Sequence, residues 1–345
     1  MPAWRRARSF FPITESAVYL DHAGAAPLSS RVDEALRRFA TDATRARHAA
    51  LEEEVERARG RIAVLLGADA PEITFVPNAA RGLALVAGDV DWRPGDRMAL
   101  VGDRPEWSPL RVPGVEALRV PLALGQLPPG ALEEAVQHPR TRLLAVASVD
   151  AATGTRIPLA AIGRLCREHG VRLCVDASHS AGCLDVDVAE HLIDDLVTDA
   201  HRWLLGLSGT GILFRRRHAS WDTDPAPRVF EEGAHNEIGI AALGAAVDLL
   251  LETGMGEIEG RVLQLTEHLV KRLDAIAVTI QSPRARLASG IVSFRVDGEA
   301  PSRTAQRLER RGIRVGASAG AVRASPHFYN DEAEIDALVD ALIAR

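Results

Sequence analysis

The alternation of short apolar runs with amphipathic segments constrains the fold of this 345-residue chain most strongly. Through the first two-thirds of the sequence, apolar runs typical of buried strands recur at 73–76, 98–101, 117–120, 143–149, 172–175, 194–198 and 212–214. Residues at helical spacing separate several of these runs, as at 132–137 and 159–168. Buried strands that alternate with helices predict a mainly parallel sheet covered on both faces, with ligands bound at the carboxyl ends of the strands.

The pattern changes near residue 238. Two long helices are predicted at about 238–252 and 258–276, followed by a strand at 291–295, a helix at 303–311, a strand near 313–315 and a closing helix from residue 331. This arrangement is typical of a smaller α+β domain. The first long helix could belong to either domain or bridge the two.

Charge and cysteine content exclude several classes of function. The net charge is −6 and the positive residues are interspersed, so no basic stripe indicates nucleic-acid binding. The first twelve residues carry arginines without a following apolar run, which predicts neither a signal peptide nor a membrane span. Three clustered cysteines, Cys166, Cys174 and Cys183, predict reduced thiols in a cytoplasmic protein rather than disulfides or a metal site.

Seven short motifs, in one order along nearly the whole chain, carry a family resemblance. They are YLDHAGAAPLS (19–29), ITFVPNAARGL (73–83), EWSP (106–109), VDASHSAG (175–182), AHRWLLG (200–206), EEGAHN (231–236) and RASPHFYN (323–330). The chain resembles a class V aminotransferase of pyridoxal-phosphate (PLP) fold type I, in the branch of isopenicillin N epimerase-like and cysteine desulfurase-like proteins.

The resemblance implies a fold and an assembly. The expected fold is a mainly parallel seven-stranded sheet flanked by helices, with a smaller α+β C-terminal domain. The expected division is an N-terminal segment over 1–20 that packs on the small domain, a large domain over 21–237 and a small domain over 238–345. Because sites in this family are built at the subunit interface, a homodimer is also expected.

Four residues match positions that hold cofactor ring and substrate in the family. Asp176 is the implied partner of the pyridine nitrogen, where a carboxylate keeps the ring protonated and electron-accepting. His179 lies where relatives carry Gln or His near the ring oxygen, and Trp107 matches the aromatic that stacks on the ring face, although a core tryptophan is an ordinary alternative. Arg323 matches the arginine that grips a substrate carboxylate through two hydrogen bonds.

The implied phosphate pocket lacks expected hydroxyl groups. Asn78, Ala79 and Ala80 begin a helix after a strand, where free N–H groups can hold a phosphate. Relatives usually have a hydroxyl residue at the position of Ala80 and a threonine at that of Ala234. His201 remains as a donor to the phosphate and, with His179, as a candidate to move protons.

Arg202 stands where the family carries the lysine that binds PLP as a Schiff base. Its guanidinium stays protonated and is not a nucleophile, so Arg202 cannot form that bond. The chain has 41 Lys+Arg residues, of which Lys271 is the one lysine. Lys271 lies off the apolar face of its predicted helix, which favours a solvated surface residue. PLP or pyridoxamine phosphate (PMP) is therefore expected to bind non-covalently, if at all.

Three hypotheses of function follow. The first is a pseudoenzyme or binding protein without lysine-dependent transamination. The second is an enzyme with non-covalent PLP or PMP that acts on an amino-acid-like substrate as an aminotransferase, epimerase or lyase. The third is an ordinary PLP aminotransferase or epimerase in which Arg202 is an engineered substitution for lysine, or in which the lysine lies elsewhere in the chain. The resemblance implies that cysteine desulfurase activity needs a cysteine in the small domain, near the loop at 316–320, to carry the persulfide. No cysteine follows Cys183 and this loop has none, so that activity is not expected.

Overall fold

A computed structural model describes residues 2–102, 107, 112–122, 125–217, 231, 233 and 235–344. Its central element is a seven-stranded sheet in the order β2-β8-β7-β6-β5-β3-β4. The strands are β2 (Ile73–Val76), β3 (Arg97–Val101), β4 (Glu116–Val120), β5 (Thr141–Ala147), β6 (Arg172–Asp176), β7 (Asp195–Asp199) and β8 (Gly211–Arg215). Strand β8 is antiparallel to both of its neighbours and the other adjacent strands pair in parallel, so the predicted mainly parallel, seven-stranded sheet is confirmed.

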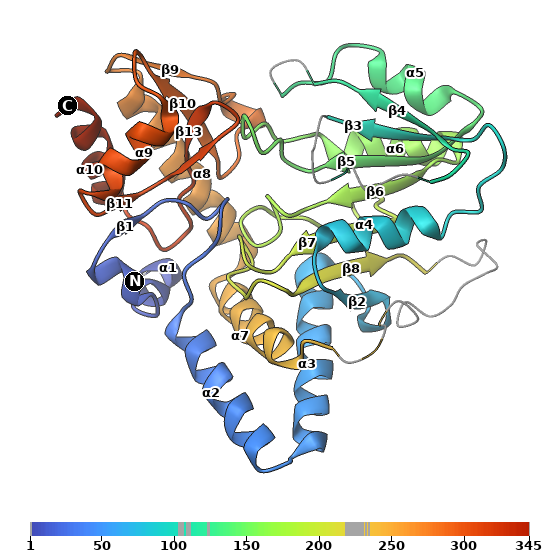
Figure 1. Ribbon diagram of the computed structural model, residues 1–345, viewed down its shortest axis with the longest axis horizontal. Coiled ribbons are helices and arrows are strands. Elements are labelled where there is room, and N and C mark those ends of the chain that lie inside the picture. Colours follow the sequence, from blue (N-terminus) through green and yellow to red (C-terminus); the bar gives the residue numbers. More distant parts are fainter. Residues whose placement is uncertain are drawn as a thin grey trace.

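Helices cover both faces of this sheet (Figure 1). One face packs on α4 (Ala79–Gly88), and the opposite face on α3 (His48–Leu66), α5 (Ala131–Gln137), α6 (Leu159–His169) and α7 (Glu237–Thr253). Successive residues of β6 lie on opposite faces of the sheet: Leu173 and Val175 pack on the α6 side, and Cys174 packs on the α4 side. Every residue of β6 is buried, as expected of a strand covered twice.

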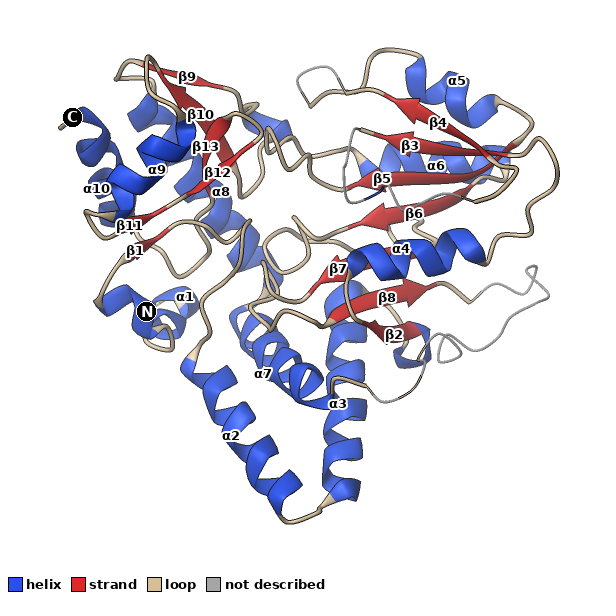
Figure 2. Cartoon of the chain, in the orientation of Figure 1, coloured by secondary structure: helices blue, strands red, loops and turns tan. Residues whose placement is uncertain are grey.

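The C-terminal part forms a second, antiparallel sheet (Figure 2). Its order is β12-β13-β10-β9, from β9 (Val278–Ile280), β10 (Val292–Val296), β12 (Gly316–Ser318) and β13 (Ala321–Ala324). Three helices contribute buried side chains to the core of this part: α8 (Met255–Leu273), α9 (Pro301–Glu309) and α10 (Glu332–Ile343). Its buried side chains form a core cluster separate from those of the large sheet.

The N-terminal segment joins this C-terminal part. Strand β1 (Val18–Tyr19) pairs in parallel with β11 (Ile313–Arg314), and Leu20 is buried in the C-terminal core cluster. The short helix α1 (Ala3–Arg8) precedes it, and α2 (Ser30–Thr44) follows and forms an arm with α3 (Figure 1). Between β1 and α2 the chain therefore passes from the C-terminal part to the large domain. The predicted domain limits stay a prediction.

Several C-terminal strands were not predicted. The strands β9 and β12 have half-buried or exposed residues and are only three residues long, which is shorter than the run of four or more residues by which a strand is recognised. In the described part of the chain, no single helix is long and apolar enough to cross a membrane; α7 and α8, bent by 83°, pass that test only as a pair.

Candidate functional site

Asp176 lies at the carboxyl end of β6, where parallel sheets of this kind bind ligands. Its side chain is almost fully buried, and Oδ1 accepts a hydrogen bond from the Ser178 N–H at 3.0 Å. Since residues two apart share a face, Asp176 lies on the same face as Cys174, the face that carries α4. The residue predicted to face a pyridine nitrogen is therefore held by the strand and by the turn that follows it.

The turn after β6 buries His179. It packs tightly against the turn after β7, because a Cβ on Gly182 would come within 2.3 Å of the Trp203 carbonyl oxygen. Gly182 also has a φ of 98°, which glycine adopts readily. Trp107 is buried in the core cluster beside α4. The roles of His179 and Trp107 toward a cofactor ring stay predictions.

A carboxylate of the chain itself occupies the N-terminus of α4. Asn78 caps this helix by accepting the Arg81 N–H at 2.8 Å, and the Ala79 N–H is donated to Asp199 Oδ1 at 3.0 Å. The start of a helix attracts negative charge because its N–H groups and its dipole are directed toward it. Asp199, at the end of β7, thus takes a position that a phosphate would use.

Arg202 lies in the turn after β7 and is directed to the chain's own oxygens. Its Nε lies 3.5 Å from Asp199 Oδ2, and its Nη1 donates to the carbonyl oxygens of Ala23 and of Gly24, the latter at 3.1 Å. The guanidinium therefore joins the carboxylate at α4 to the N-terminal segment. Burial, and then the positive charge of Arg202, lower the pKa of the neighbouring His201.

Arg323, on β13, faces a second internal carboxylate. Its Nη2 lies 3.8 Å from Asp21 Oδ1, which is an ion pair without a close hydrogen bond. Arg323 Nε and Asp21 Oδ1 are buried, and neither has a hydrogen-bond partner among the described residues. Burial lowers the pKa of Arg323 and raises that of Asp21. This approach requires a glycine at 316, because a Cβ there would come within 2.7 Å of Asp21 Oδ1. Arg323 is therefore incompletely satisfied.

The fold thus brings most of the predicted residues together with two that sequence reasoning missed, Asp21 and Asp199. Both lie inside or beside the recognised motifs, but a carboxylate's partner is not visible from its own segment. Lys271 is exposed and pairs with Glu267 at 2.6 Å, so its predicted surface position is confirmed. Ala80 lies in the first turn of α4. Ala234 lies outside the described residues.

The comparisons with known proteins establish the family. The model of the aminotransferase class-V family matches residues 18–338. This chain belongs to that family. It is 28% identical to a probable cysteine desulfurase of Methanothermobacter thermautotrophicus, over 97% of this chain and 96% of the relative. It is also 28% identical to the isopenicillin N epimerase of Streptomyces clavuligerus, over 83% of each chain.

Solved structures agree. The apo cysteine desulfurase of Thermococcus onnurineus NA1 has a TM-score of 0.87 at 25% identity, covering 97% of this chain and 96% of that one. A mutant of C-DES with glycine covalently linked to the PLP cofactor has a TM-score of 0.89 at 25% identity, covering 97% of this chain and 98% of that one. The predicted PLP fold type I is confirmed, and the family is PLP-dependent.

The expectation that the chain is not a cysteine desulfurase is wrong. Relatives and structural neighbours that match almost the whole chain are named cysteine desulfurases. The exclusion depended on one missing side chain in the segment 316–320, which forms β12 and the turn into β13. A single loop residue leaves the fold and the rest of the site in place, so it cannot separate this chain from those proteins.

The described residues fit the two ends of PLP unequally. Asp176 and His179 are buried beside the strand ends, as the ring requires. At the phosphate end, the Ala79 N–H is already bonded to Asp199, and a phosphate there would meet a negative charge. The phosphate end therefore does not fit in this arrangement of the side chains.

Proposed function

We propose that this chain is a class V family protein in which an internal ion pair, Asp199 with Arg202, replaces the phosphate contact and the lysine anchor of a PLP enzyme. It acts as a binding protein, or pseudoenzyme, without lysine-dependent transamination. The observation that carries the proposal is the hydrogen bond from the Ala79 N–H to Asp199, whose other oxygen lies 3.5 Å from Arg202.

Electrostatics support this proposal. A phosphate that accepted the Ala79 N–H would lie beside the Asp199 carboxylate. Two like unit charges about 4 Å apart repel by about 4 kcal/mol at an effective dielectric constant of about 20. Arg202 offsets part of this repulsion. Its two contacts to the carbonyl groups of Ala23 and Gly24, however, hold it toward the N-terminal segment.

The ligand that the site would keep is amino-acid-like. Arg323 is almost fully buried, and within the described part of the chain its Nε has no hydrogen-bond partner. A ligand carboxylate would form bidentate hydrogen bonds with that guanidinium. Asp21 does not form them, because its Oδ1 lies 3.8 Å from Arg323 Nη2. We place this binding protein in the cytoplasm as a homodimer, in keeping with its cysteine content and the expected interface sites.

A second candidate is favoured by the named relatives. A cysteine desulfurase-type activity, or another reaction on an amino acid, would use PLP or PMP held without a Schiff base to residue 202. The retained Asp176 and His179 favour this candidate, because they are the residues that fit the cofactor ring. It requires Asp199 to move away from the start of α4.

Titration of the purified protein with PLP and with PMP separates the two candidates. Calorimetry reports binding, and the absorption spectrum reports whether a Schiff base forms. The binding protein is supported when neither cofactor binds. Saturable binding of PLP or PMP, together with release of sulfide or alanine from cysteine, would overturn it in favour of the second candidate. An aldimine band at neutral pH in the unmodified protein would overturn both, because Arg202 cannot form one.

A further inference from the structure

A second pocket lies on the face of the sheet opposite to α4. It has a volume of about 440 Å³, within the range of small-molecule sites. The apolar part of its wall includes Ile157, Leu159, Leu184 and Val186, which belong to the core cluster on the α6 side. Asp176 faces the other side of the sheet, so this pocket is distinct from the candidate site.

The floor of the pocket is polar and already hydrogen-bonded. Ser148, directly after β5, and Ser180, in the turn after β6, are buried, and their hydroxyl oxygens lie 2.6 Å apart. Ser148 Oγ also donates to the Asp176 carbonyl oxygen at 3.2 Å. The floor therefore needs no ligand to satisfy it. At the centre of the pocket, a ligand would therefore meet hydroxyl oxygens and apolar side chains, and no cationic group of the described residues.

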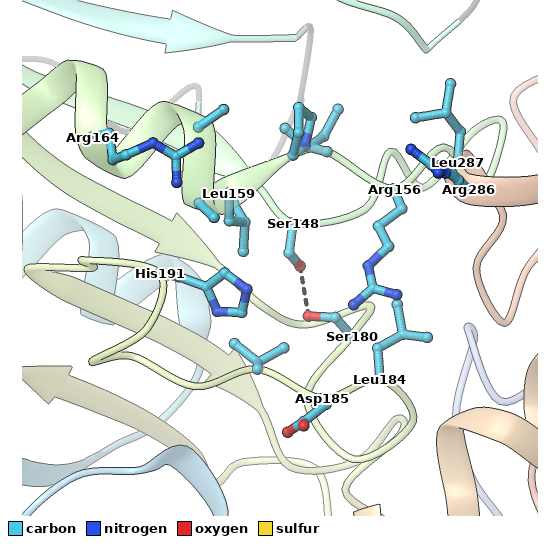
Figure 3. Close-up of a pocket in the computed structure, with 15 residues that line it drawn as sticks. Ser148, Arg156, Leu159, Arg164, Ser180, Leu184, Asp185, His191, Arg286 and Leu287 are labelled. Carbon is cyan, nitrogen blue, oxygen red and sulfur yellow. Dashed lines mark hydrogen bonds between the residues drawn. The ribbon is translucent and has the colours of Figure 1, made fainter. Parts of the chain in front are cut away.

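The charged groups of the pocket lie around that floor. Figure 3 shows Arg164 and His191 on one side and Arg156 and Arg286 on the other, with the Ser148–Ser180 hydrogen bond between them. Arg156 is paired with Glu259 at 2.5 Å. Within the described ranges, neither Arg164 nor Arg286 has an ion-pair partner. Two guanidinium groups are thus uncompensated on opposite sides.

Two further features modulate this charge. The first turn of α6 enters the pocket, and its N-cap, Pro158, makes no side-chain cap, so the start of the helix adds partial positive charge. Asp185 also lines the pocket and opposes an anion. Arg164 and Arg286 have no ion-pair partner in the described ranges, so the single carboxylate of Asp185 leaves the pocket positive.

We propose that this pocket binds an elongated organic dianion, a dicarboxylate with an apolar spacer. The negative ends would meet Arg164 on one side and Arg286 on the other, and the spacer would lie on the apolar wall. A ligand with one anionic group would leave one of the two guanidiniums without a partner, and a purely apolar ligand would leave both without one. The site is independent of the proposed function, because neither Asp199 nor Arg323 contributes to it.

Adipate and hexanoate test this site, since both have six carbons and they differ by one carboxylate. We expect calorimetry on the wild-type protein to show adipate binding about tenfold more tightly than hexanoate, because one charge-assisted contact is lost. The double variant R164Q/R286Q should weaken adipate binding by about tenfold or more. Arg167→Gln, on the same helix but outside the pocket, is the matched control and should leave it unchanged.

Asp185→Asn gives a result of opposite sign. It removes the opposing negative charge, so adipate should bind several-fold more tightly. The substituted arginines are exposed and have no ion-pair partner among the residues that the structure describes, so circular dichroism should show R164Q/R286Q folded as the wild type. The proposal is overturned if adipate does not bind, if hexanoate binds equally well, or if R164Q/R286Q binds adipate like the wild type. Because none of these variants touches Asp199 or Arg202, the result is separable from cofactor titration.

Discussion

Restoring the lysine alone should not restore a PLP enzyme. In Arg202→Lys the new amine would lie near Asp199, whose carboxylate stabilises the protonated, non-nucleophilic form of lysine and still bonds to the Ala79 N–H. The double variant D199N/R202K removes the carboxylate charge and keeps an amide of the same shape. We therefore expect a Schiff base with PLP only in the double variant.

The magnitude follows from the removed repulsion. A full unit charge at about 4 Å is worth about 4 kcal/mol at an effective dielectric constant of about 20, which is about a thousandfold in Kd. The Asp199 side chain is 15% exposed, so solvent screening reduces this repulsion energy. We expect PLP to bind D199N/R202K roughly ten- to a thousandfold more tightly than R202K.

The assay is absorption spectroscopy during PLP titration, followed by borohydride reduction and mass spectrometry of the peptide that contains residue 202. The matched control is D33N/R37K, which makes the same two changes in an exposed pair at 2.9 Å on α2. It should bind PLP no better than the wild type. An aldimine on R202K alone, or none on D199N/R202K when that variant is folded, would refute the role assigned to Asp199.

Three further predictions concern ligand binding and stability. Asp21→Asn should tighten carboxylate binding at Arg323 several-fold, measured by calorimetry with amino acids, because it removes the internal carboxylate at 3.8 Å. Arg59→Met should destabilise the fold by about 3 kcal/mol in urea unfolding, because it leaves the Glu231 carboxylate buried without its 2.7 Å partner. Burial lowers the pKa of His327 to about 4, so stability should fall by about 3 kcal/mol between pH 6.5 and 4.

The sign of the pH effect follows from proton uptake. The unfolded chain binds a proton at His327 near pH 6.5 and the folded chain only near pH 4, so acid favours unfolding across that window. His327→Gln should flatten the dependence of stability on pH in this window, and an unchanged slope would contradict the assignment.

For Asp21→Asn, unchanged or weaker amino-acid binding counts against the competing carboxylate. If Arg59→Met unfolds at the same urea concentration as the wild type, its predicted loss of stability is wrong.

Local patterns predicted the large domain well. The apolar runs that became β2, β5 and β6 are buried on both faces, so their composition reflects their environment directly. Strand β7 is shifted by one residue from the predicted range 194–198: it begins at Asp195 and ends at Asp199. That residue continues the backbone ladder of β7 while its side chain bonds to α4, so the polar end of the strand carried no apolar signal.

The sequence by itself determined the family, the order of strands along the large domain, and the replacement of an amine by the guanidinium of Arg202. These properties are local or ordered along the chain, and motifs record them directly. Only the tertiary structure decided where the carboxylates of Asp199 and Asp21 lie. Each meets its partner across more than a hundred residues of chain, through strand ends that only folding brings together. Electrostatics at such a site depends on distances of a few ångströms, which no linear motif specifies.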